Sequence, residues 1–228
     1  MRSAQTTLYL FSFLLLLLSS APPAFAQLAA EFGAVSLYKD RGEDQDEKDT
    51  DLRPAIQGGW RYDTTPGFFI GNWFSTGKFS RANVQIDSIV GFGKDINKDT
   101  EISLGYNHTV HPRQGDENSG ELFFILSYKN LNLELYRGMK AGVNRNNMYY
   151  NVDYLYPLSE RLGLNIGAGY EYYSEKGLTG KIDYRTGLFY ELNDSSTVSL
   201  VFAGANHKHA VDDGIRNNRL ILGLNMEF

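Results

Sequence analysis

The chain has 228 residues, a length that suits one domain once a targeting segment is removed. Its formal net charge is −5, and such an acidic balance argues against nucleic-acid binding, which needs clustered Lys and Arg. It contains no Cys, so no disulfide framework can hold an exported fold together. The abundance of Tyr (15), Phe (14) and Gly (23) favours a fold held by a closed ladder of backbone hydrogen bonds rather than by a large core.

The first residues have the pattern of a secretory signal peptide. Arg2 is followed by a nearly continuous apolar run at residues 8–18, and Ala24-Phe25-Ala26 forms a cleavage site of the A-x-A type. The alternative, a membrane anchor, needs about 20 apolar residues, and this run is shorter. We therefore expect residues 1–26 to be removed and residues 27–228 to form the mature domain.

Alternation of apolar and polar residues dominates the mature sequence and predicts β-strands. We expect about twelve strands, most of them near ten residues long, which is the length that a tilted strand needs to cross a bilayer. They are expected at residues 30–39, 53–63, 67–76, 83–94, 100–110, 119–129, 131–139, 146–156, 161–173, 180–191, 196–205 and 218–228.

The connections between these strands sort by length. Those after even-numbered strands are short, such as 157–160 and 193–195, whereas most of those after odd-numbered strands are longer and more polar, such as 40–52, 77–82 and 206–217. Short periplasmic turns alternating with longer extracellular loops are the plan of an outer-membrane barrel. The sequence therefore predicts an all-β, transmembrane, antiparallel up-and-down β-barrel, surrounded by lipid and lipopolysaccharide in the outer membrane of a Gram-negative bacterium.

The last strand carries an additional pattern. Apolar side chains occupy every second position up to the final residue, and they are Leu220, Leu222, Leu224, Met226 and Phe228. This pattern resembles the C-terminal signal read by the barrel-assembly machinery. We expect these residues to act as the assembly signal and to face lipid.

Three motifs in the first mature third resemble the signature of the TorF-type porin family. They are Tyr38-Lys39-Asp40-Arg41-Gly42, Pro54-Ala55-Ile56-Gln57-Gly58-Gly59 and Gly67-Phe68-Phe69-Ile70-Gly71-Asn72-Trp73-Phe74-Ser75. The resemblance is close over about forty residues and extends to the rest only by length and strand plan. It implies an outer-membrane location, a barrel fold and a porin function.

Nine charged residues fall on the polar side of the alternation and are expected to face the lumen. As a pore lining, their acidic bias favours cations. The alternative is a packed lumen in which ion pairs brace the wall, because twelve strands lie between the plugged eight-stranded and the open sixteen-stranded barrels. The nine are Arg61, Asp87, Glu101, Glu121, Glu134, Asp153, Glu171, Asp183 and Arg185.

Other features favour a structural interpretation. Arg41 and Arg61 are expected to pair with nearby carboxylates, although Arg41 could also hold an anionic solute. The acidic segment 43–51 is expected to be a solvated extracellular loop rather than a Ca²⁺ or Mg²⁺ site. His108 with His111, and His207 with His209, lack the spacing and partners of a metal site.

The sequence thus predicts a monomeric, narrow diffusion channel for small solutes with a weak cation preference and no cofactor. One alternative is a closed barrel that acts as a structural or adhesive protein through its extracellular loops. A less favoured alternative is a lipid hydrolase, which needs its reactive His on a strand of the outer wall. Of the His residues, His108 is the one that falls inside a predicted strand.

Overall fold

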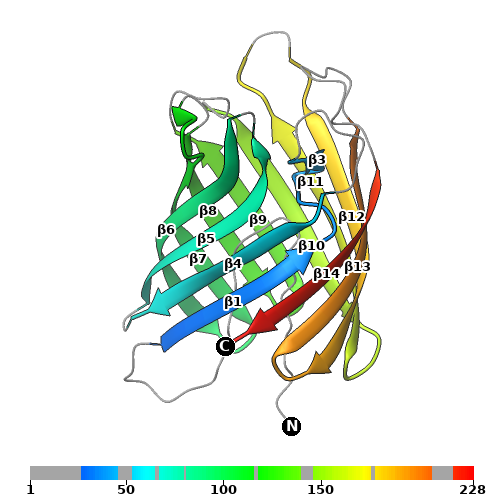
Figure 1. Cartoon of the computed structure of the whole chain (residues 1–228). Helices are drawn as coiled ribbons and strands as arrows, with labels where there is room; N and C mark the ends of the chain where they lie inside the picture. Colours follow the sequence, from blue (N-terminus) through cyan, green and yellow to red (C-terminus); the bar gives the residue numbers. More distant parts are fainter. Residues whose placement is uncertain are drawn as a thin grey trace.

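The protein was analysed as a computed structural model that describes residues 27–45, 53–64, 67–79, 81–115, 118–139, 146–175, 178–206 and 218–228. Within these residues, twelve strands form a closed antiparallel barrel in which each strand pairs with its neighbours in the chain and β1 closes the ring against β14 (Figure 1). The barrel predicted from alternation is confirmed. Its strands are β1 (Gln27–Val35), β4 (Ala55–Asp63), β5 (Phe68–Phe79), β6 (Ala82–Asn97), β7 (Thr100–Val110), β8 (Ser119–Tyr128), β9 (Leu131–Gly138), β10 (Met148–Pro157), β11 (Leu162–Tyr172), β12 (Lys181–Asn193), β13 (Ser196–Asn206) and β14 (Arg219–Glu227).

The two faces of the barrel wall differ in chemistry. Successive side chains of a strand point to opposite faces, so one set faces the lumen and the other faces outward. The outward set is apolar and exposed, for example Leu104, Ile166 and Leu222. The luminal set is largely polar and buried, for example Asn151 and Glu171. None of the described segments forms a helix long and apolar enough to span a membrane.

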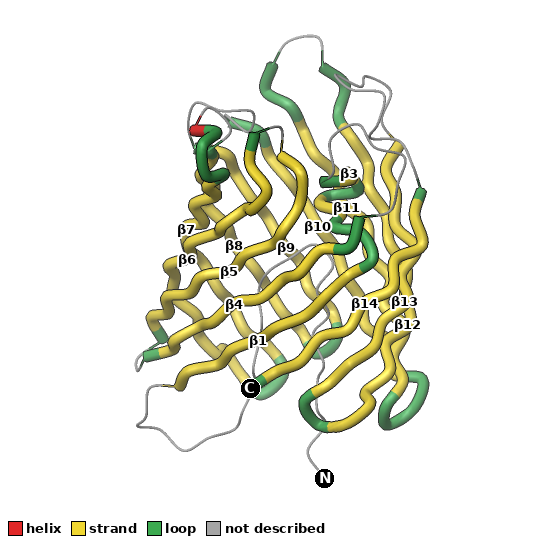
Figure 2. The backbone as a smooth tube through the Cα atoms, in the orientation of Figure 1, coloured by secondary structure: helices red, strands yellow, loops and turns green. Residues whose placement is uncertain are grey.

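The two ends of the barrel also differ. At the end that carries Phe228, tight turns at residues 98–99, 129–130 and 194–195 join consecutive strands (Figure 2). Longer connections lie at the opposite end, as the sequence predicted, with one exception. The predicted loop 77–82 is wrong, because β5 continues to Phe79 and β6 begins at Ala82, with a register shift between Thr76 and Phe79.

The first strand ends earlier than the alternation indicated. A strand was expected at 30–39, but β1 occupies Gln27–Val35 and pairs with β4 over its whole length. After Val35 the chain leaves the wall. It then forms two short strands, β2 (Lys39–Asp40) and β3 (Glu43–Asp44), which pair only with each other.

Candidate functional site

The segment after β1 folds into the barrel instead of extending outward. The backbone N–H of Ser36 still donates to the carbonyl of Leu222 on β14, at 2.8 Å. The chain then turns inward, and β2 and β3 lie inside the barrel near the end opposite Phe228 (Figure 1). We call residues 36–45 the luminal hairpin. Its contacts with the wall define the candidate site.

The turn of the luminal hairpin depends on Gly42. Arg41 and Gly42 have φ values of 45° and 78°, and two positive values in a two-residue loop are the mark of a type I′ turn. A Cβ on Gly42 would also lie 2.6 Å from the Cβ of Ala205 and 2.7 Å from the Cβ of Asp183. The turn therefore rests directly on the wall formed by β12 and β13, and both its backbone angles and its contacts favour glycine.

The Arg41 side chain crosses to the wall opposite β1. Its Nη1 and Nη2 donate to Oε1 and Oε2 of Glu121 at 2.9 and 2.6 Å, which is a bidentate pair, and Glu171 Oε1 lies 3.9 Å from Nη1. The ring centroids of Tyr149 and Tyr136 lie 4.4 and 5.3 Å from Cζ. We call Glu121, Tyr136, Tyr149 and Glu171 the cation box. Its four residues come from β8, β9, β10 and β11, so one guanidinium contacts four adjacent strands.

Two further cationic side chains of the wall form ion pairs with the arm of the hairpin that contains β3. Lys181 on β12 is 2.6 Å from Glu43 and 3.0 Å from Glu171, so it links the hairpin to the cation box. Arg219 on β14 is 3.1 Å from Asp44. The side chains of Lys181, Glu171 and Asp44 are all less than a tenth exposed. Removing one member of a buried ion pair typically costs about 3–5 kcal/mol, because the other charge stays buried without compensation.

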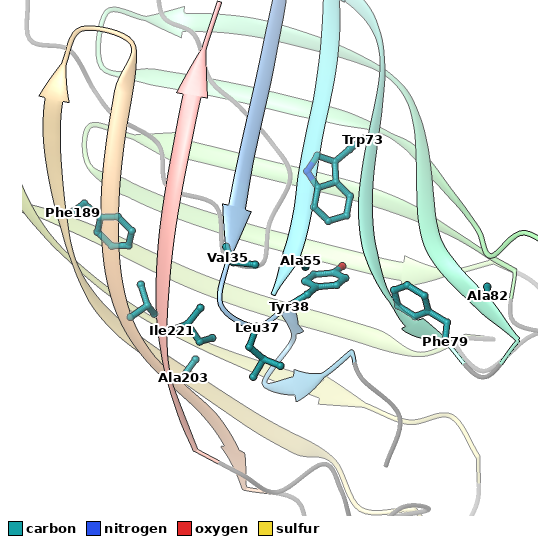
Figure 3. Packing of buried hydrophobic residues seen from close by; sticks show 11 residues of the cluster. Val35, Leu37, Tyr38, Ala55, Trp73, Phe79, Ala82, Phe189, Ala203 and Ile221 are labelled. Carbon is teal, nitrogen blue, oxygen red and sulfur yellow. The ribbon is translucent and has the colours of Figure 1, made fainter. Parts of the chain in front are cut away.

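The base of the hairpin packs on apolar side chains of the lumen. Tyr38 meets Trp73 and Phe79 edge to face, with ring centroids 5.6 and 6.4 Å apart, and Leu37 is 2% exposed (Figure 3). This cluster joins the inner faces of β4, β5 and β6 to those of β12, β13 and β14. Its members are Val35, Leu37, Tyr38, Ala55, Trp73, Phe79, Ala82, Phe189, Val201, Ala203 and Ile221.

The three sequence motifs meet around this hairpin. The first supplies Tyr38 and Arg41, which are its apolar and its cationic anchors. The third supplies Trp73, which receives the Tyr38 ring, and Ser75, which is fully buried. The second supplies Gln57, whose Nε2 donates to Ser75 Oγ at 3.1 Å. The motifs therefore encode the hairpin and the part of the wall that holds its base.

All nine charged residues predicted to face inward lie on the inner face of the wall, and most are buried. Arg185 pairs with Asp153 and lies 3.5 Å from Asp183. Arg61 pairs with Asp63 at 2.7 Å, and its guanidinium lies 3.8 Å from the centroid of the Phe69 ring. The expected pairing of Arg41 and Arg61 with carboxylates is confirmed.

Asp87, Glu101 and Glu134 take no part in the ion pairs described above and accept hydrogen bonds from neutral neighbours. Gln85 Nε2 donates to Asp87 at 3.0 Å, and Ser103 Oγ donates to Glu101 at 3.2 Å. The hydroxyl of Tyr136 donates to Glu134 at 3.2 Å. When the ion pairs described above are set aside, these acidic groups leave the lumen with more negative than positive charge.

The sequence did not predict the hairpin or the luminal position of four charged residues, Lys39, Glu43, Asp44 and Lys181. Glu43 and Asp44 were expected in a solvated loop, which is wrong, because both are held inside the barrel by ion pairs. The rest of the acidic segment, 46–51, lies outside the described residues. Lys39 was also missed; its Nζ is fully buried and donates to the Gly42 carbonyl at 2.9 Å. Lys181 could have been found, since it shares the alternation of Asp183 and Arg185.

The remaining candidates lie away from the hairpin tip. His108 is on the outer face beside Tyr106, and the His111 ring packs 4.6 Å from the Phe79 ring. His207 and His209 lie outside the described residues. Among the residues described, no group of three or more His, Cys, Asp or Glu side chains could hold a metal ion.

The terminal strand lies as the alternation predicted. Leu220, Leu222 and Leu224 point outward and are exposed, Met226 is half-buried, and Phe228 is 77% exposed. The backbone N–H of Phe228 donates to the carbonyl of Ala30 at 2.9 Å, so the final residue helps to close β14 onto β1.

These features define a class of protein: a closed twelve-stranded antiparallel β-barrel with an apolar outer face and a hairpin folded into a charged lumen. A family model described as "Bacterial protein of unknown function (Gcw_chp)" matches residues 20–222, and the chain belongs to this family. The TorF-type resemblance stays a prediction. No curated protein sequence matches the chain.

Several solved structures with a similar fold are porins. A structure titled "KdgM porin" has a TM-score of 0.62 and 10% identity, with 88% of this chain and 99% of that chain covered. A second, titled "KdgM porin in complex with disordered oligogalacturonate", has a TM-score of 0.59 and 9% identity, with coverage of 90% and 99%. The NanC porin has a TM-score of 0.52 and 10% identity, with coverage of 88% and 98%. At these identities the likeness shows the fold alone.

Proposed function

We propose that the protein is an outer-membrane channel for small solutes whose bore is narrowed by the luminal hairpin. The observation that carries the proposal is a closed barrel that is apolar outside, charged inside, and holds a hairpin clamped across its lumen. An apolar outer face with every backbone group paired in a closed sheet suits lipid, and a polar interior suits water and solutes. The porin fold of the structures reported above supports the same function.

The proposed location follows from the same surface. Exposed outward residues such as Ile70, Val152 and Leu200 suit contact with lipid and lipopolysaccharide. Tyr156 and Tyr172 lie at the C-terminal ends of the antiparallel strands β10 and β11 and therefore at opposite ends of the barrel, where aromatic girdles meet the membrane interface. The signal peptide expected at residues 1–26 lies outside the described residues and remains a proposal. So do recognition of the Phe228 strand by the barrel-assembly machinery, a monomeric state and the TorF-type relationship.

We further propose a weak cation preference. The sequence alone suggested seven acidic and two basic luminal residues, but Lys39, Arg41 and Lys181 add positive charge that this count left out. The remaining bias rests on acidic groups such as Asp87 and Glu101, which accept hydrogen bonds from neutral side chains. Fixed charges of one sign concentrate the opposite ion, and screening over about 8 Å at physiological salt keeps the bias small.

Reversal potentials of refolded protein in planar bilayers under a salt gradient test this function. We expect a small conductance with a weak preference for cations. The double variant Asp87→Asn, Glu101→Gln should reduce that preference, because it removes negative charge without breaking one of the ion pairs described above. Asp183→Asn is a poorer choice, since Asp183 lies beside Arg185. An anion preference in the wild-type protein would contradict the charge assignment.

A closed structural or adhesive barrel is the second candidate. It is favoured by the depth to which the hairpin is packed, since Leu37, Lys39 and Tyr38 are all buried. Correctly folded protein that conducts no ions, with or without the hairpin, would support this second function. A lipid hydrolase would need its His on the outer face; His108 lies there, but its ring stacks on Tyr106, and we do not propose an enzymatic reaction.

A further inference from the structure

The cation box is made entirely by the barrel wall, and the luminal hairpin only occupies it. Glu121, Tyr136, Tyr149 and Glu171 lie on four adjacent strands, whereas Arg41 arrives from the far side of the lumen. The bidentate carboxylate and the two ring faces match the planar, delocalised charge of a guanidinium. Arg41 thus shows which chemical group the wall selects at this place.

The box is organised by wall residues, independently of the hairpin. The Tyr136 hydroxyl donates to Glu134, and the Tyr149 hydroxyl donates to Asp183 Oδ1, each at 3.2 Å. These bonds fix the directions of the two rings. Gly169 leaves room for this arrangement, because a Cβ there would lie 2.2 Å from the Tyr149 hydroxyl. A site whose walls are fixed in advance loses little free energy to ordering when a ligand binds.

The charge of the box also requires a cation. Glu121 and Glu171 carry two negative charges, and Lys181, at 3.0 Å from Glu171, supplies one positive charge from the wall. One negative charge then remains at Glu121, and Arg41 compensates it. If the hairpin withdraws, Glu43 leaves with it, and the wall keeps the Glu121 carboxylate without the guanidinium of Arg41. Such a carboxylate attracts a cation of similar shape.

We propose that the cation box is a binding site for small solutes that carry a guanidinium group, and that Arg41 occupies it as an internal competitor. A solute that displaces Arg41 releases the hairpin tip from the wall. The proposal names a solute class for the channel and to that extent rests on the proposed function. Binding itself can be tested without any transport measurement.

Ethylguanidinium is the direct probe, because it replaces the atoms that Arg41→Ala removes. The refolded wild-type protein, Arg41→Ala, and Arg41→Ala combined with Glu121→Gln would be compared by the temperature at which the compact, heat-modifiable barrel unfolds. We expect Arg41→Ala to unfold at a lower temperature, and low concentrations of ethylguanidinium to restore most of the loss in a saturable manner. Sodium chloride at equal ionic strength should not restore the unfolding temperature. Ethylammonium should restore it less than ethylguanidinium does, because it cannot bind both oxygens of Glu121 at once.

The controls separate binding from a general salt effect. Wild-type protein should respond only at much higher concentrations, because Arg41 competes for the box. The double variant should not respond, because its bidentate acceptor is lost. An equal response to ethylguanidinium and sodium chloride, or an equal response in the double variant, would overturn the proposal. If Arg41→Ala does not refold, the refolding yield with and without ethylguanidinium becomes the readout, and absence of rescue overturns the proposal. A barrel that binds the probe but conducts no ions would refute the channel and leave the binding site intact.

Discussion

The luminal hairpin places a cationic and an acidic side chain, Arg41 and Asp40, close to the same carboxylates of the wall. Arg41 needs the carboxylates of the cation box, whereas Asp40, next to it in the chain, lies near the carboxylates of Glu121 and Asp87. Loss of water around Asp40 raises the pKa of its carboxyl to about 7, and the neighbouring Arg41 offsets this only in part. The hairpin therefore carries one group that titrates close to neutrality.

The raised pKa of Asp40 predicts a pH-dependent stability. Between its ordinary pKa of 3.8 and about 7, the folded state binds a proton that the unfolded state releases, so this group's contribution to stability is lost as pH rises through that window. Asp40→Asn stays neutral at every pH. We expect the variant to gain stability over wild type at about pH 8 and to lose this advantage at about pH 5, as measured by urea unfolding in detergent. A constant difference between the two proteins across this range would contradict the assignment.

Gly42 provides a second test at the residue scale. Its φ of 78° and its contact with Ala205 both disfavour a side chain, and a left-handed conformation costs an L-residue about 1–2 kcal/mol. Gly42→Ala should lower the free energy of unfolding by at least this amount. Gly115→Ala is the matched control, since the nearest atom to its new Cβ would be Asn118 Nδ2 at 4.0 Å. Equal losses in the two variants would show that the turn does not rest on the wall.

At the scale of elements, each barrel strand separates two environments. Neighbouring positions on β13 illustrate this, since Leu200 is 44% exposed on the outer face and Ser199 lines a small interior cavity beside Glu31 and Glu227. Lys on a lipid-facing position near the bilayer midplane costs about 2–4 kcal/mol. Leu200→Lys should therefore impair assembly of heat-modifiable barrel, whereas Ser199→Lys gains two nearby carboxylates and should assemble normally. Normal assembly of Leu200→Lys together with impaired assembly of Ser199→Lys would show that the inner and outer faces are assigned the wrong way round.

The connections between strands give a second test at this scale. A tag inserted near Asn97, in the short turn between β6 and β7, should be inaccessible on intact cells, because that turn lies at the same end as Phe228. Tags near Asp46 or Asp212 should be accessible, although both positions lie outside the described residues. Labelling near Asn97 but not at the other two sites would invert the proposed topology.

Much of the wall could be predicted from the sequence, because alternation is a local property. Leu220 and Leu222, for example, repeat every second residue, and the same repeat placed Glu121 and Glu171 inside. The hairpin could not be predicted in this way, because its stability comes from contacts distant in the chain. Arg41 and Glu121 are 80 residues apart, and the acidic character of Glu43 and Asp44 resembles that of a solvated loop until Lys181 and Arg219 are placed beside them.

The whole molecule combines a barrel of channel type with a hairpin of its own chain that narrows the lumen. The hairpin is fixed by the Arg41 clamp, the ion pairs of Lys181 and Arg219, and the packing of Tyr38 on Trp73. These contacts lie on opposite sides of the lumen. Removing the hairpin should therefore widen the bore without opening the wall.

The most direct test is the single-channel conductance of the barrel in which residues 38–44 are replaced by a Gly-Ser linker of equal length, measured beside wild type in planar bilayers. Both proteins would first be shown to be heat-modifiable, so that folding is established separately. We expect a small conductance for wild type and a clearly larger one for the variant, because the linker has neither the cationic nor the aromatic anchors of the hairpin. Equal conductance in the two folded proteins would contradict a bore narrowed by the hairpin.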